Sequence, residues 1–106
     1  MLELNGRGIP ARHANRLRVA VVMFLQAHPG RAFTSRGVVE WLIDNYPRRA
    51  DSPIAISSLL GVYGRAWGVE KDGWNRVSGG SRARAIRWRA PPAEVMARDD
   101  WPRLEL

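Results

Sequence analysis

The chain has 106 residues, of which 45% are hydrophobic and 25% are charged, and this size suits one domain around one hydrophobic core. Its formal net charge is +7, which favours a polyanionic partner. Cysteine is absent, which excludes disulfides and thiolate metal sites, and the longest apolar run, residues 19–25, is too short to cross a bilayer.

Arginine provides almost all of the positive charge, because Lys71 is the single lysine among 17 basic residues. Guanidinium groups suit bidentate contacts with phosphate and guanine, but a GC-rich genome would also replace lysine with arginine throughout a protein. Residues 91–106 differ from the rest, because their net charge is −2. The N-terminus has no signal-peptide pattern. We therefore expect a soluble cytoplasmic protein that associates with the nucleoid.

The sequence predicts a loose arm over residues 1–9 and a first helix over residues 10–27, which begins at a proline suited to the first turn. Basic side chains in the first half of a helix interact unfavourably with the helix dipole, which lowers stability slightly. For the arginines at positions 12, 16 and 18, either the surface tolerates this cost or the side chains face a phosphate backbone. The apolar stripe of this helix consists of Leu17, Ala20, Val21, Phe24 and Leu25.

A short strand over residues 31–33 and a second helix come next. The helix has Thr34 or Ser35 as its N-cap and runs through Asn45, and a basic loop follows over residues 47–52. The side chains of this helix that are spaced for burial are Val38, Val39, Trp41, Leu42 and Tyr46.

A third helix is predicted from Pro53, with Ser52 as N-cap, to about Ala66. The low helix propensity of two glycines favours an alternative end near Gly64. The side predicted to be buried holds Ile56, Leu59, Leu60, Tyr63 and Trp67, and the opposite side holds Ile54, Ser57, Ser58, Gly61 and Arg65.

Residues 69–73 read as a turn-rich connector, and residues 74–89, WNRVSGGSRARAIRWR, predict a β-hairpin with five arginines and no acidic residue. The sequence allows two pairing registers for the strands of this hairpin. A turn at residues 80–81 pairs Val77 with Arg84 and Asn75 with Ile86, whereas a turn at residues 79–80 pairs Val77 with Arg82. In the first register, residues 86 and 88 point to the core and residues 87 and 89 point outward.

The order of helix, strand, helix, helix and hairpin resembles that of the winged helix-turn-helix family over residues 12–89. The segments that carry the resemblance are RAFTSRGVVEWL for the first strand and second helix, SPIAISSLLGVYGRAW for the recognition helix and WNRVSGGSRARAIRWR for the wing. The resemblance implies an α+β fold with three helices and a small antiparallel sheet that ends in a C-terminal hairpin wing. The chain would then divide into an arm (1–9), a winged-helix domain (10–90) and a tail (91–106).

This resemblance also implies binding to double-stranded DNA, with the third helix in the major groove and the wing on the phosphates or in the minor groove. The loop at residues 47–52 is longer than the tight turn of the family, and the third helix offers few amides for base edges, so phosphate and shape contacts should dominate. About 6 to 10 phosphate contacts would make binding strongly salt-dependent. The DNA contacts implied are Arg36, Arg48, Arg49, Ser57, Ser58, Gly61, Arg65, Arg76, Arg82, Arg84, Arg87 and Arg89.

The sequence contains no catalytic pattern, because His13 and His28 stand alone and the glycines at 79–80 lack the following helix of a phosphate-binding loop. We expect no enzyme activity, cofactor, metal site, small-molecule substrate or membrane partner. The function implied is that of a transcriptional regulator, phage-type control factor or architectural protein, and the alternative is a module that binds protein or RNA. In the tail, Trp101 and Leu104 should either pack on the domain or mediate a homodimer.

Overall fold

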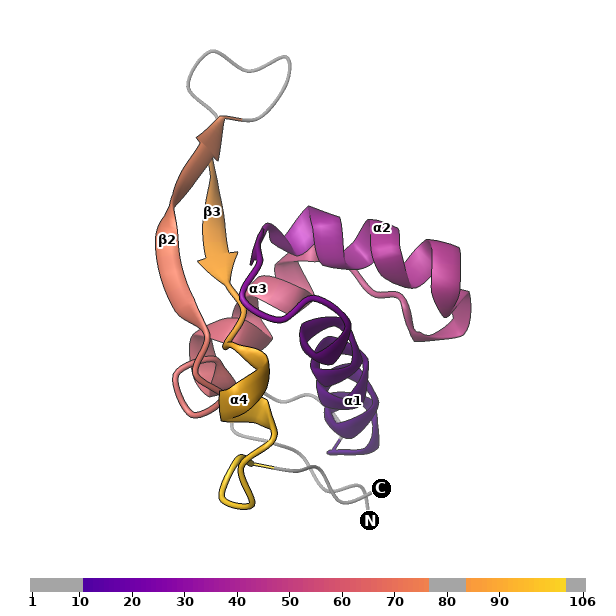
Figure 1. Cartoon of the computed structure of the whole chain (residues 1–106). Helices are drawn as coiled ribbons and strands as arrows, with labels where there is room; N and C mark the ends of the chain where they lie inside the picture. Colours follow the sequence, from indigo (N-terminus) through magenta and orange to yellow (C-terminus); the bar gives the residue numbers. More distant parts are fainter. Residues whose placement is uncertain (1–10, 77–83, 103–106) are drawn as a thin grey trace.

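The computed structural model describes residues 11–76 and 84–102, which form four α-helices and a three-stranded antiparallel sheet (Figure 1). The predicted α+β class is confirmed. The predicted number of helices is too low, because a short fourth helix forms in the segment expected to be a tail. The elements in chain order are α1 (Ala11–Ala27), β1 (Ala32–Phe33), α2 (Ser35–Asn45), the 3₁₀ turn η1 (Pro47–Arg49), α3 (Pro53–Tyr63), β2 (Glu70–Arg76), β3 (Arg84–Arg89) and α4 (Ala93–Met96).

Side-chain caps fix the starts of α2 and α3, as predicted. The Thr34 hydroxyl accepts a hydrogen bond from the backbone N–H of Gly37 at 3.2 Å, and the Ser52 hydroxyl accepts one from Ala55 at 3.1 Å. Such caps satisfy N–H groups that have no partner within the helix. The residues that begin both helices are therefore set by the local sequence.

The end of α3 lies at Tyr63, so the prediction of Ala66 is wrong and the alternative end near Gly64 is confirmed. Gly64 occupies the C-cap position, where an added Cβ would overlap the carbonyl oxygen of Leu60. The chain then reverses direction at Gly68, whose φ of +80° suits glycine. β2 begins two residues after this turn, at Glu70.

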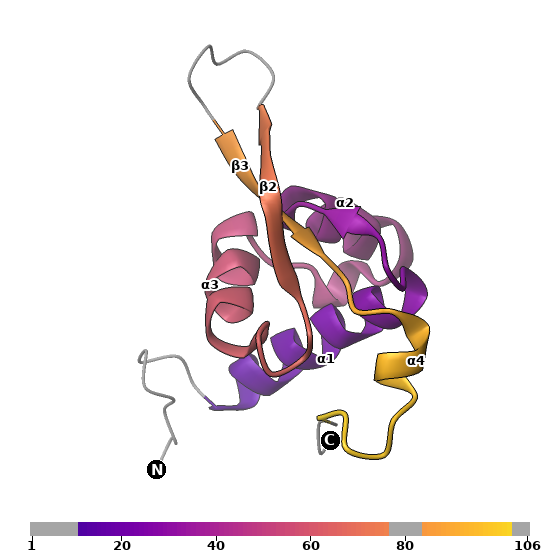
Figure 2. The ribbon, with the colours of Figure 1, turned by 60° about the vertical axis from the view of Figure 1, so that its left-hand side comes forward.

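The sheet has the order β1-β3-β2, with both strand pairs antiparallel. The region predicted as a hairpin is thus part of a three-stranded sheet. Residues 70–73, predicted as a connector, belong to β2, because Glu70 pairs with Arg89 and Lys71 pairs with Trp88. We call β2 and β3 together the β2–β3 ribbon. Its distal end projects beyond the helices in both views (Figures 1 and 2).

A bulge between Lys71 and Trp74 shifts the register of the ribbon. It contains Gly73, whose φ is +90°, the backbone conformation that such bulges commonly assign to glycine. Beyond the bulge, Asn75 pairs with Ala85. The predicted pair of Asn75 with Ile86 is therefore wrong by one residue, and both pairs predicted for Val77 lie outside the described residues.

The core lies between the first three helices and the sheet. All five residues predicted to form the stripe of α1 are buried, and α2 contributes Val38 and Leu42. Tyr46 was predicted to be buried but is 42% exposed, because it follows the last turn of α2 with non-helical backbone angles. The other buried apolar residues come from the sheet, α3 and the C-terminal segment: Phe33, Ile56, Leu59, Leu60, Trp67, Val69, Trp88, Ala90, Met96 and Trp101.

The segment that follows β3 packs on this core. Trp101 is 5% exposed, and its indole Nε1–H donates to the carbonyl of Trp67 at 2.8 Å. The first of the two predicted roles of the tail is thus confirmed for Trp101, whereas Leu104 lies outside the described residues. Among the helices described, none combines the length and apolar character needed to cross a bilayer.

Candidate nucleic-acid interface

One face of α3 points to solvent. Its core side is formed by Ile56, Leu59 and Leu60, so residues on the opposite side of the helix remain exposed. Ile54, the second residue of the helix, is 79% exposed, and Val62 is 47% exposed. We call this surface the outer face of α3; it consists of Ile54, Ser58, Gly61 and Val62, with Arg65 just beyond the helix end.

Three residues predicted to contact DNA lie on this face. Ser58 is half-buried, and Gly61 and Arg65 are exposed. A Cβ added to Gly61 would meet no atom within 4 Å, so the backbone there is open to a close approach. The structure therefore brings these three predicted residues together.

Ser57 is half-buried and is engaged within the protein, so its predicted contact with DNA stays a prediction. Its hydroxyl forms a 2.6 Å hydrogen bond with that of Ser35, which is buried at the start of α2. This hydrogen bond places the Ser57 side chain at the contact between α3 and α2. Ser57 therefore joins two helices of the body.

The charges near the outer face are positive. No aspartate or glutamate occurs between Pro53 and Val69, and Arg65 is exposed. Arg36 is also exposed, but it shares the solvent side of α2 with the exposed acidic residues Glu40 and Asp44. A polyanion would thus meet less repulsion at α3 than along α2.

The ribbon carries fewer available arginines than its sequence predicts, because Asp72 on β2 engages both Arg87 and Arg89 on β3. Arg89 Nη2 donates to Asp72 Oδ2 at 2.6 Å, and Arg89 Nη1 donates to the carbonyl of Gly30 at 2.9 Å. Arg87 Nε donates to the Asp72 carbonyl at 2.7 Å and lies 3.6 Å from Asp72 Oδ2. The predicted outward orientation holds, and both arginines are engaged within the protein, so their predicted contacts with DNA stay a prediction.

The distal part of the ribbon brings two other arginine positions together. Arg76 and Arg84 are directly opposite each other in the antiparallel register. Like charges at opposed positions destabilise an antiparallel pair unless an anion lies between them. The register thus places two of the predicted DNA-contact positions opposite each other, and Arg82 lies outside the described residues.

A small pocket with a volume of about 90 Å³ separates α1 from η1 and is lined by Arg16, Leu17, Arg48, Arg49, Ala50 and Asp51. Arg16 Nη2 donates to the carbonyl of Arg48 at 3.2 Å, which fixes one guanidinium above the turn. Arg48 is exposed and Arg49 is half-buried. The pocket is thus a basic surface beside the start of α3, as predicted for the loop at residues 47–52. Arg18, by contrast, lies with its guanidinium 5.0 Å from the centre of the Tyr63 ring.

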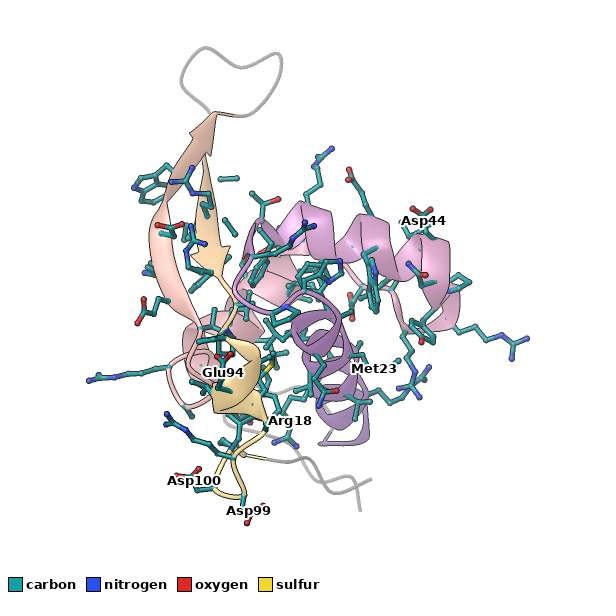
Figure 3. The ribbon with its side chains drawn as sticks, viewed as in Figure 1. Arg18, Met23, Asp44, Glu94, Asp99 and Asp100 are labelled. Atoms are coloured by element: carbon teal, nitrogen blue, oxygen red, sulfur yellow. The ribbon has the colours of Figure 1, made fainter. Side chains whose placement is uncertain are left out.

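Acidic side chains gather at the opposite end of the molecule from the distal ribbon. Glu94, Asp99 and Asp100 lie there, on α4 and the turn that follows, whereas Asp44 lies apart from them at the end of α2 (Figure 3). Within residues 11–76 and 84–102, no group of three or more histidines and carboxylates is arranged to hold a metal ion. Carboxylates thus gather around α4, and others lie on α2 and β2.

Two features of this interface were missed from the sequence. Asp72 was assigned to a connector, although its place two residues before the first arginine-rich strand could have suggested a cross-strand partner. Ile54 was noted on the outer side of α3 but was not assigned a role. Comparison of the chain with protein-family models, with curated proteins and with solved structures finds no match.

Proposed function

We propose that the protein binds double-stranded DNA as a winged-helix protein, with the outer face of α3 in the major groove and the β2–β3 ribbon on the adjacent backbone. The order of elements from α1 to β3 and the sheet order β1-β3-β2 support this architecture. The observation that carries the proposal is the outer face of α3. It is exposed, has no carboxylate along its length and ends at Arg65.

The arginines that would contact phosphate lie beside α3 and at the distal end of the ribbon. Arg65 follows α3, Arg48 and Arg49 lie in η1 beside its start, and positions 76 and 84 lie on the ribbon. These five would give about five contacts, fewer than the sequence predicts, because Asp72 occupies Arg87 and Arg89.

The experiment compares two arginine variants that change the net charge equally. Arg65→Ala removes a charge beside α3, whereas Arg98→Ala removes an exposed charge near the acidic end. Binding of the full chain to a fluorescent duplex should weaken by about tenfold for Arg65→Ala. It should change by less than about twofold for Arg98→Ala, because salt screens a charge so far from the bound phosphates.

A protein partner is the second candidate, and the exposed apolar side chains of Ile54 and Val62 favour it. The two functions differ in their dependence on salt, since contacts with phosphate release counterions and apolar contacts do not. Equal affinities of Arg65→Ala and Arg98→Ala for DNA, or no binding of wild-type protein to any duplex, would contradict the DNA proposal.

A further inference from the structure

We infer that the outer face of α3 recognises the 5-methyl groups of thymine, so that the protein prefers duplexes with thymines in the major groove. This inference rests on the proposed function and names the base chemistry that α3 reads. Its basis is the exposure of two branched apolar side chains, Ile54 and Val62, on the face assigned to the groove.

The position of Ile54 suits contact with bases. It is the second residue of α3, and recognition helices contact base edges mainly with their N-terminal residues. Its 79% exposure means that its neighbours in the described structure cover little of the side chain. An isoleucine at the first turn of a groove-bound helix would therefore lose its contact with water only upon binding.

Val62 extends the apolar surface along the same face. It follows Ile54 by eight residues, or about 12 Å along the helix axis. Gly61 lies between the two on this face, and the open space around it permits close approach of the backbone. The two apolar side chains can thus reach bases about three to four steps apart at 3.4 Å per step.

Thymine is the base that matches this chemistry. It alone presents a methyl group in the major groove, and apolar side chains contact it, whereas guanine and adenine are read by arginine or by amides. The outer face of α3 offers no asparagine or glutamine. A hydrophobic protein partner is the other conceivable occupant, but Arg65 at the end of the face and the lack of carboxylates from Pro53 to Val69 favour a polyanion.

The test removes and adds the methyl group without changing hydrogen bonding. Deoxyuridine replaces thymine in one set of duplexes, and 5-methylcytosine replaces cytosine in another. Affinity should fall by about fourfold for each contacted methyl lost, and should rise by about the same factor where a methyl is gained. The measurement uses the full chain at a fixed salt concentration, because salt alone changes affinity.

Variants link the preference to α3. Ile54→Ala should lower affinity for the thymine duplex and abolish the difference between thymine and deoxyuridine. Ile43→Ala is the matched control, because Ile43 is 54% exposed on α2 and should affect neither quantity. Both substitutions are at exposed positions, so the fold should be retained.

The outcomes separate the inference from the function on which it rests. Salt-dependent binding that is equal for thymine and deoxyuridine duplexes would overturn the inference and leave the proposed function intact. A self-associated wild-type protein that Ile54→Ala converts to a monomer, without any change in DNA affinity, would overturn it in favour of a second copy of the chain. Failure to bind any duplex would overturn both.

Discussion

The carboxylate of Asp72 lies 2.6 Å from the guanidinium of Arg89 across the β2–β3 ribbon and holds this arginine against the body of the protein. The pair is only half-buried, with side-chain exposures of 49% for Arg89 and 32% for Asp72, so it contributes little to stability. Under the proposed function its main effect would concern binding, because an arginine paired with a carboxylate is less available to a phosphate.

Replacing Asp72 by Asn should therefore strengthen DNA binding. The log-log dependence of affinity on salt should steepen by about one unit, since Arg89 becomes available for a phosphate contact. The free energy of unfolding should fall by less than about 1 kcal/mol. Titrations of a labelled duplex over a range of salt concentrations measure the slope, and Asp100→Asn, which alters the charge equally at the acidic end, is the control. Identical slopes for the two variants would contradict the role assigned to Asp72.

Gly73→Ala should destabilise the protein by about 1–2 kcal/mol, because its φ of +90° strains an L-residue. The new Cβ would also lie 3.3 Å from Arg87 Nη2. Denaturant unfolding measures the change. A variant as stable as the wild type would show that the bulge does not need glycine.

Gly61→Ala should have the opposite effect, because Gly61 lies within α3 and a Cβ there meets open space. Alanine favours the helix over glycine by about 0.8–1 kcal/mol, so the free energy of unfolding should rise by up to that amount. The same denaturant titration applies. A loss of stability would mean that the outer face of α3 is covered by a part of the chain.

Trp101→Ala should cost about 3–5 kcal/mol, since it removes a buried indole from the core. Trp101→Phe keeps most of the apolar volume but leaves the Trp67 carbonyl without its 2.8 Å hydrogen bond, and should cost about 1–2 kcal/mol. Thermal unfolding of both variants distinguishes these contributions. Wild-type stability in Trp101→Ala would contradict the docking of the C-terminal segment.

Features set by neighbouring residues could be predicted from the sequence. The caps Thr34 and Ser52 and the stripe of α1 depend on contacts within one or two turns, so the starts of α2 and α3 and the buried face of α1 are as expected. The order of the elements followed from these local signals.

Features that join distant residues could not be predicted. Asp72 and Arg89 are 17 residues apart, and Ser35 and Ser57 are 22 residues apart, so the partner within each pair depends on the fold and the strand register. The bulge at Gly73 shifts the register by one residue, which a count from the expected turn does not reveal. The location of the DNA site on α3 stays a prediction, while the engagement of Arg87 and Arg89 by Asp72 within the protein was not foreseen.

The most direct test of the central claim is the salt dependence of binding between the full chain and a random-sequence duplex. About five phosphate contacts predict that the logarithm of the association constant falls with the logarithm of salt concentration with a slope of about −4 to −5. A slope near zero, or no measurable binding at low salt, would contradict the assignment of α3 and the β2–β3 ribbon to DNA.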